Sequence, residues 1–469
     1  MLARRICLVA MALIAVAADW PQFRGPNAMG IAEGTKLPDK IGKDKSVIWK
    51  VELPPGHSSP IIAADRIYVT AVRDKKQLVT IALDPTDGKV LWEREAAYKK
   101  LEKIHTIGSY AQPTPVSDGE VVLSFFGSSG LYCHDKYGKL LWSHPFGPFP
   151  NDFGAGSSPL IVGDRVILNQ DHDNGSFLMA FDKRTGKQLW KVDRSEFPRG
   201  YATPVIWDVD GKKQVVVAGT LRVVGYDLET GAEVWTVRGL SRIANMTPAI
   251  GSDNILYLAA WAPGGDETER IEAPPFAEMI EKYDKNKNGT LEADELPPGE
   301  LKNRFTQIDR DKDNKITKDE YENMRRIFTT AQNMVVAIKP GGKGDVTATH
   351  VLWSQRKQLP YVPSPLYYKN YVYMIKNGGL LSSLDAKTGK PTKQERVYGK
   401  SNYYASPVAG DGKIYLFSER GDFSVVKAGP DWEELSWGKL NEPIFATPAI
   451  ADGRIYVRTE KSLYCFGLK

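Results

Sequence analysis

A short motif built around proline recurs eight times along the 469-residue chain and constrains the fold more than any other feature. In each copy a small residue precedes the proline, and an apolar pair, a short turn and a β-rich segment follow it. The eight prolines are Pro60, Pro115, Pro159, Pro204, Pro248, Pro365, Pro407 and Pro448. Five of the seven intervals between them are 41–45 residues long, and only the fifth, at 117 residues, is grossly longer. Four short strands in a fixed period of this length form one blade of a β-propeller.

A second motif, Asp-x-x-Thr-Gly-x-x-x-Trp, follows within most of the units, as in the segment from Asp182 to Trp190. It indicates a strand, a tight turn in which glycine supplies the positive φ angle, and a second strand. We expect the tryptophans to be structural, each packing between neighbouring blades while its indole N–H meets a loop carbonyl. They are Trp49, Trp92, Trp142, Trp190, Trp235, Trp353 and Trp437.

The two ends of the repeat region predict how the ring closes. The last unit ends at Gly467 without an outermost strand, whereas Ser46–Glu52, with Trp49, reads as an orphan outer strand. Pairing these segments completes the eighth unit and removes exposed sheet edges. The sequence therefore predicts an all-β, eight-bladed β-propeller with four-stranded blades, closed by its N-terminal strand.

The tryptophan motif resembles the docking repeat of pyrroloquinoline-quinone (PQQ)-like propellers, which include quinoprotein dehydrogenases and the outer-membrane-assembly propeller. The segment Trp20–Asn27 also resembles a recurrent start of bacterial exported PQQ-like repeat proteins. The resemblance implies the fold and suggests PQQ-dependent oxidation as an alternative function. The adjacent cysteines of the quinoproteins are missing, because Cys133 and Cys465 lie far apart in sequence, and no Cys-x-x-Cys-His haem motif is present. We therefore do not expect PQQ as a cofactor, and we favour free thiols over a disulfide.

The long interval contains an insert, residues 262–332, in which helical spacing replaces strand alternation. Two twelve-residue loops within it have oxygen-bearing groups at positions 1, 3, 5, 7, 9 and 12, the pattern of a calcium-binding EF-hand. Position 7 contributes its backbone carbonyl, so a lysine there is harmless. We predict an EF-hand pair that binds up to two Ca²⁺ ions. The predicted ligands are Asp284, Asn286, Asn288, Thr290, Glu292 and Glu295 in the first loop, and Asp309, Asp311, Asp313, Lys315, Thr317 and Glu320 in the second.

Two features of these loops favour different sites. The second loop has more carboxylates, which favours tighter binding there, but Asn314 replaces the glycine expected at position 6, which favours the first loop. Leu291 and Ile316, at position 8 of each loop, are expected to join the loops through a short β-bridge. Pro297 and Pro298 truncate the helix between the loops, which favours structural calcium over signalling. Because the insert joins the second and third strands of blade five, we expect it to overhang the central funnel.

The loops that lead into the blades are expected to form the mouth of that funnel. Polar and aromatic side chains on them suggest a site for an unknown small molecule, such as a planar acid or a sugar, or for a peptide or protein. The candidates are His57, Tyr110, Gln112, Arg199, Tyr201, Arg242, Asn245, Asn402 and Tyr404. We interpret the protein as a binding or scaffold module and predict no catalytic residue.

The N-terminus indicates export. Residues 1–18 combine Arg4 and Arg5 with the apolar run Ile6–Ala17, as in a signal peptide, and the run is too short to span a membrane. The formal net charge of +5 falls to +3 without those two arginines, which argues against nucleic acid as a partner. We expect a periplasmic or extracellular protein with propeller segments at 19–261 and 333–469.

Overall fold

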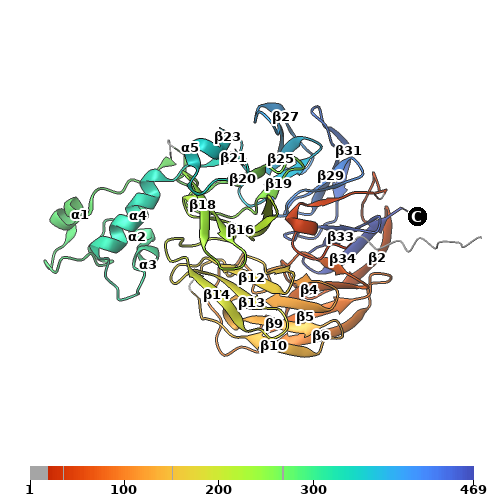
Figure 1. Cartoon of the computed structure of the whole chain (residues 1–469), viewed down its shortest axis with the longest axis horizontal. Helices are drawn as coiled ribbons and strands as arrows, with labels where there is room; N and C mark the ends of the chain where they lie inside the picture. The colour runs from red at the N-terminus through yellow and green to blue at the C-terminus, as the bar shows by residue number, and fades with distance from the viewer. Residues whose placement is uncertain (1–18, 35, 150, 267–268, 469) are drawn as a thin grey trace, which may run out of the picture.

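The structure is a ring of eight antiparallel sheets around a central channel, as predicted (Figure 1). It is a computed structural model and describes residues 19–34, 36–149, 151–266 and 269–468. The predicted signal peptide, residues 1–18, lies outside the described residues. Within the described part of the chain, no helix is both long and apolar enough to cross a membrane.

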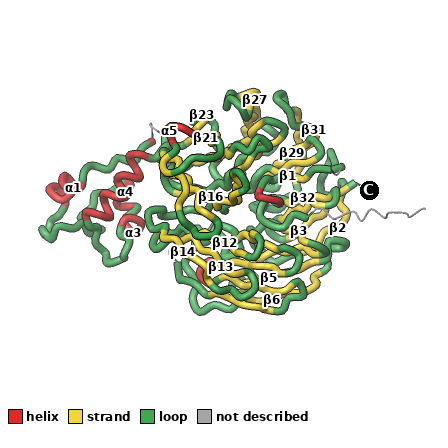
Figure 2. The backbone as a smooth tube through the Cα atoms, viewed as in Figure 1, coloured by secondary structure: helices red, strands yellow, loops and turns green. Residues whose placement is uncertain are grey.

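Each blade is a meander whose first strand lies next to the channel. Figure 2 shows that the longer helices lie together outside the ring of strands. The strands of blades one to four are β3 (Ile61–Ala63), β4 (Arg66–Arg73), β5 (Gln77–Leu83) and β6 (Val90–Ala96); β7 (Val116–Ser117), β8 (Val121–Phe125), β9 (Leu131–Asp135) and β10 (Leu140–His144); β11 (Leu160–Val162), β12 (Arg165–Gln170), β13 (Phe177–Asp182) and β14 (Gln188–Asp193); and β15 (Val205–Val209), β16 (Lys212–Gly219), β17 (Arg222–Asp227) and β18 (Glu233–Arg238). The strands of blades five to eight are β19 (Ala249–Ile250), β20 (Leu256–Ala260), β21 (Met334–Ile338) and β23 (Val351–Gln355); β24 (Leu366–Tyr368), β25 (Tyr371–Lys376), β26 (Leu380–Asp385) and β27 (Pro391–Arg396); β28 (Val408–Gly410), β29 (Lys413–Phe417), β30 (Asp422–Lys427) and β31 (Glu433–Lys439); and β32 (Ala449–Ala451), β33 (Arg454–Arg458) and β34 (Ser462–Gly467).

The predicted closing strand is confirmed. Strand β2 (Val47–Glu52) pairs antiparallel with β34 and places Trp49 opposite Cys465, so it completes blade eight. Cys133 and Cys465 are both buried free thiols. A short parallel strand, β22 (Gly344–Asp345), extends blade four beyond β18.

The segment before β2 crosses the channel, which the sequence did not predict. Trp20 pairs with Ile62 of blade one, and the guanidinium of Arg24 donates to the carbonyl of Pro365 in blade six (2.7 Å). Strand β1 (Ile31–Ala32) then pairs in parallel with β28 of blade seven. Residues 20–32 therefore join blade one to blades six and seven.

Five of the seven tryptophans occupy the predicted positions between blades. Each ring packs closely against the turn glycine of the next blade. For example, a Cβ added at Gly186 would lie 2.6 Å from the Trp142 ring. The indole donations are Trp49 to Pro85 (3.1 Å), Trp92 to Lys136 (2.9 Å), Trp142 to Lys183 (2.8 Å), Trp190 to Leu228 (3.2 Å) and Trp353 to Ala386 (2.8 Å), all to backbone carbonyls.

For the other two tryptophans the prediction was wrong. Trp235 donates to the side chain of Gln214 in its own blade, and Trp437 is 57% exposed and stacks on Tyr398 (4.1 Å between ring centroids). Both face a blade without the tight turn. In blade five, residues 339–350 replace that turn, and in blade eight the two chain segments that close the ring meet there.

The insert between β20 and β21 is a small helical unit with its own apolar core. Its helices are α1 (Phe276–Tyr283), α2 (Glu300–Asn303), α3 (Phe305–Ile308) and α4 (Lys318–Thr330), whereas α5 (Thr347–His350) lies between β22 and β23. The backbones of Leu291 and Ile316 form the predicted bridge, with N–H to carbonyl distances of 3.1 and 2.8 Å.

The insert does not overhang the funnel, contrary to our expectation. Figure 1 shows its helices beyond the outer edge of the ring, and none of its residues lines the channel mouth. Instead it contacts loops of blades three and four, where Leu221 packs against its core and Asn174 donates to the carbonyl of Arg310 (2.7 Å). These contacts hold the unit beside the rim and leave the channel mouth uncovered by it.

Candidate functional site

A cavity of about 190 Å³ opens at the mouth of the channel, where the loops lead into the blades. Every blade contributes to it the hydroxyl residue that directly precedes its repeat proline. These residues are Ser59, Thr114, Ser158, Thr203, Thr247, Ser364, Ser406 and Thr447. The repeat itself therefore builds the site, because the same position of each unit faces the axis.

These hydroxyl residues form a nearly complete circle of hydrogen bonds, which we call the hydroxyl ring. At seven of the eight junctions the backbone N–H of one member donates to the side-chain oxygen of the next, for example Ser158 to Thr203 over 3.0 Å. All eight residues are buried. The ring fixes the loops that surround the cavity, and within the part of the chain that the structure describes no acceptor takes the hydroxyl protons.

Seven of the described residues that line the cavity carry an aromatic ring. The rings of His57 and Phe445 stack 4.2 Å apart at 17°, and Tyr404 leans against Phe445 at 5.3 Å. Phe153 and Tyr201 meet edge to face at another part of the wall, and the channel-crossing segment adds Phe23.

His57 is neutral at physiological pH. Burial and, to a smaller extent, the nearby Arg458 guanidinium lower its pKa to about 4. Arg458 is itself fully buried and donates to the carbonyl of Thr70 (2.7 Å) and the side chain of Ser58 (2.6 Å). Of the residues that the structure describes, 22 line the cavity, and none of these is Lys, Arg, Asp or Glu.

The structure brings together five of the nine predicted candidates, namely His57, Gln112, Tyr201, Asn245 and Tyr404. All five stand two positions before a member of the hydroxyl ring, and the same position lines the cavity in all eight blades. Reading that register from the repeat would also have found Gly156, Val362 and Phe445, which a search for polar side chains missed.

The other four candidates stand four or five positions before the ring and are engaged elsewhere. The Tyr110 hydroxyl donates to the carbonyl of Glu102 (2.7 Å), and Arg199 forms a bidentate pair with Asp173. Arg242 donates to the carbonyl of Pro263 (2.7 Å), and Asn402 donates to the carboxylate of Glu419 (3.0 Å).

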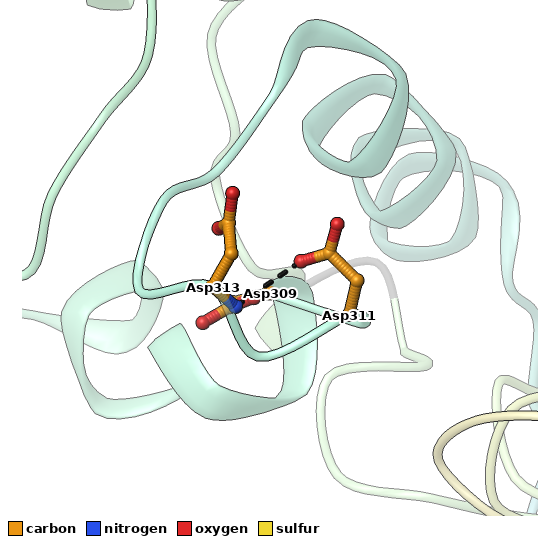
Figure 3. A group of neighbouring side chains, drawn as sticks. All are labelled: Asp309, Asp311 and Asp313. Atoms are coloured by element: carbon orange, nitrogen blue, oxygen red, sulfur yellow. Dashed lines mark hydrogen bonds between the residues drawn. The ribbon is translucent and has the colours of Figure 1, made fainter.

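The second loop of the insert brings three carboxylates together. Oxygens of Asp309, Asp311 and Asp313 lie within 4.8 Å of one another (Figure 3). Asp309 is 4% exposed, and its Oδ1 has no hydrogen-bond partner among the described residues. Burial raises the pKa of Asp309, and the carboxylates of Glu320 and Asp313 raise it further. A cation at this point would supply the missing partner and relieve the repulsion.

The rest of that loop has the shape that such a cation needs. Asn314 adopts the left-handed conformation (φ 67°) in place of the expected glycine, so the sharp turn is preserved. Glu320 accepts from the N–H groups of Arg310 (2.8 Å) and Thr317 (2.9 Å), which hold its carboxylate beside the loop.

The first loop pairs its polar groups with one another. Both carboxylate oxygens of Glu292 accept from side-chain amides, those of Asn286 (2.5 Å) and Asn288 (2.7 Å). Asp284 accepts from the backbone N–H groups of Asn288 (3.2 Å) and Gly289 (2.9 Å). Among the described residues, the second loop and not the first contains a group of three carboxylates that could hold a metal ion.

Comparison with known proteins supports the architecture. A family model described as outer membrane protein assembly factor BamB matches residues 40–150 and 75–260. None of the curated proteins compared with the chain matches it.

Several solved structures are similar to this chain along most of its length. BamB from Moraxella catarrhalis is 14% identical with a TM-score of 0.57, and the match covers 90% of this chain and 99% of that one. A europium-containing methanol dehydrogenase is 10% identical with a TM-score of 0.53, covering 96% and 98%. The quinohemoprotein alcohol dehydrogenase from Comamonas testosteroni is 13% identical with a TM-score of 0.57, covering 96% and 81%. At these identities the likeness shows the fold alone. With its eight sheets and docked tryptophans, the chain is an eight-bladed β-propeller.

Proposed function

We propose that this protein is an exported, calcium-binding propeller that acts as a binding or scaffold module and holds its ligand at the mouth of the channel. The observation that carries the proposal is the cavity, because one structural position from each of the eight blades converges on it. A concave site with aromatic walls and a few directed polar groups is the usual form of a small-ligand site.

The lining residues favour binding over catalysis. His57 is the one imidazole among them, its pKa of about 4 leaves it a poor base at neutral pH, and no carboxylate stands beside it. General acid–base chemistry needs a group that titrates near the working pH, and this wall does not supply one.

Calcium is the proposed metal, and the second loop is its main site. The carboxylates of Asp309, Asp311, Asp313 and Glu320, with the carbonyl of Lys315, form the hard oxygen donor set that Ca²⁺ prefers. The unpartnered, buried Oδ1 of Asp309 supports this assignment. When bound, Ca²⁺ supplies charge neutralisation and a fixed loop geometry.

Calorimetric titration of the apo-protein with CaCl₂ tests the metal assignment. We expect a dominant site that Glu320→Gln weakens by at least tenfold, whereas Glu295→Gln in the first loop changes it little. Binding that persists in the Glu320→Gln and Glu295→Gln double variant contradicts the ligand assignment.

The alternative is a PQQ-dependent oxidoreductase, which the fold likeness to quinoprotein dehydrogenases favours. The residues of the cavity do not fit that cofactor. PQQ has three carboxylates, and no lysine or arginine lines the cavity to pair with them. Addition of PQQ with Ca²⁺ tests the alternative, since stoichiometric quinone absorbance together with reduction of an electron-accepting dye would establish it.

A further inference from the structure

We infer that the cavity at the mouth of the channel binds an uncharged, flat ring compound that has a carbonyl-type oxygen. The ring stacks against the cavity walls, and the oxygen accepts hydrogen bonds from the hydroxyl ring. The inference rests on the proposed binding function and names the chemical class that this site takes. Three features of the cavity carry it.

The first feature is charge. An anion placed in the cavity would lose hydration without gaining a cationic partner, because no Lys or Arg lines it. Arg458 lies near His57, but its guanidinium donates to the groups of Ser58 and Thr70. A cationic ligand fares no better, because no carboxylate lines the cavity and the positive charge of Arg458 opposes it. A neutral ligand therefore loses less hydration free energy than a charged one when it is buried in this cavity.

The second feature is the shape and polarity of the walls. Seven rings surround the space, those of Phe23, His57, Phe153, Tyr201, Tyr361, Tyr404 and Phe445. The His57–Phe445 stack, 17° from parallel, presents flat ring surfaces on that side of the cavity. Planar rings gain both buried apolar area and favourable ring contacts from such walls.

The third feature is the hydrogen-bonding polarity of the hydroxyl ring. Seven of its members accept a hydrogen bond within the ring through the side-chain oxygen, and Ser59 is the eighth member. No protein acceptor among the described residues takes any of the eight hydroxyl protons. A hydroxyl that already accepts has its proton left to donate. A ligand oxygen with lone pairs satisfies these donors, whereas a ligand that offers only donors does not.

A matched set of probes tests this class. Menadione is a neutral naphthoquinone with two carbonyl oxygens, 2-methylnaphthalene keeps its flat skeleton without them, N-methylquinolinium is a flat cation, and PQQ is a flat anion. Equilibrium dialysis against the calcium-loaded protein should show menadione binding at least tenfold more tightly than each of the other three.

Variants of the protein locate the binding. Phe445→Leu keeps apolar volume but removes the ring that stacks on His57, and should weaken menadione at least fivefold. Asn402→Ala is the control, because Asn402 lies on a neighbouring loop and does not line the cavity. It should leave menadione binding unchanged.

The outcomes separate the inference from the function beneath it. Tighter binding of PQQ or of N-methylquinolinium overturns the inference and leaves a ligand-binding cavity in place. Failure of all four probes to bind overturns both the inference and the proposed ligand site, whereas the calcium titration remains an independent result. Equal affinity for menadione and 2-methylnaphthalene refutes the role of the hydroxyl ring.

Discussion

The guanidinium of Arg310 donates to the backbone carbonyl of Ser195 over 2.8 Å and so ties the second loop of the insert to blade three. The backbone N–H of the same residue donates to Glu320, the bidentate ligand in the proposed calcium site. Its carbonyl accepts from Asn174, at the tip of the β12–β13 hairpin. Arg310 therefore links the second loop of the insert to two segments of the propeller.

We predict that calcium binding and docking of the insert reinforce each other through this residue. Arg310→Ala removes one charge-assisted, half-buried hydrogen bond, so we expect a loss of about 1 kcal/mol, equivalent to roughly a fivefold weaker Ca²⁺ affinity. Calorimetry measures the affinity. Hydrogen exchange should show Ca²⁺-dependent protection of residues 171–176 and 194–197 in the wild type and less of it in the variant.

Lys312→Ala in the same loop is the matched control. Lys312 is exposed, so this substitution removes the same charge without removing the hydrogen bond to Ser195. If both variants weaken calcium binding equally, net charge explains the effect and the contact with Ser195 does not.

The tryptophan contacts predict unequal costs for two glycine substitutions. Gly186 (φ 71°) and Gly211 (φ 77°) share the left-handed conformation, so alanine costs about 1 kcal/mol at each. At Gly186 the new Cβ also meets the Trp142 ring at 2.6 Å, whereas at Gly211 nothing lies within 4 Å. Urea unfolding should therefore show Gly186→Ala to be less stable than Gly211→Ala by about 1–3 kcal/mol. Equal losses would show that blades two and three shift apart to accommodate the added methyl group.

The hydroxyl ring predicts a difference between two substitutions of Thr203. Thr203→Val keeps the side-chain shape but removes the oxygen that accepts from the buried N–H of Ser158 (3.0 Å). An unsatisfied buried donor costs about 1–3 kcal/mol, and denaturant unfolding should show that loss. Thr203→Ser keeps the acceptor and should lose less than Thr203→Val. A valine variant as stable as the serine variant contradicts the role given to the ring.

The fold could be predicted because the sequence repeats with a nearly constant period of one blade. The repeat proline recurs once per blade, the turn glycine recurs in five of the blades, and the orphan strand around Trp49 indicated how the ring closes. The exceptions among the tryptophans depended on the following blade, since Trp235 and Trp437 face blades that lack the tight turn. The channel-crossing segment, residues 20–32, has no counterpart in the repeat, so periodicity gave no signal for it.

The cavity could be predicted only in part. The candidates were chosen by residue type, whereas the position of a residue relative to the repeat proline decides whether it lines the cavity. In an extended segment, positions two apart share a side, and the residues two before the hydroxyl ring all line the cavity. Tyr110, Arg199 and Asn402 stand four positions before it, where the chain has turned away from the axis. The partners that hold them, such as Asp173 for Arg199, come from other segments of the chain and leave no local pattern.

Buried histidines predict acid sensitivity of the folded state. Burial lowers the pKa values of His57, His134 and His172 to about 4. Between pH 6.5 and 4 the unfolded chain binds protons that the folded chain does not, so stability falls as pH falls through this window and is fully present above it. His172 contributes up to about 2 kcal/mol of this loss at pH 5.

His172→Phe tests that contribution away from the proposed cavity. The His172 ring stacks on Phe149 at 4.3 Å, and neither ring nitrogen has a hydrogen-bond partner among the described residues, so phenylalanine removes a titrating group without breaking a hydrogen bond. Urea unfolding at pH 7.5 and pH 5 should show a smaller drop in stability for His172→Phe than for the wild type, by up to about 2 kcal/mol. His105→Phe, at an exposed histidine, is the control. If the pH dependence of His172→Phe matches that of the wild type, the folded state takes up the proton at His172 as readily as the unfolded chain, and the acid sensitivity has its source in other groups.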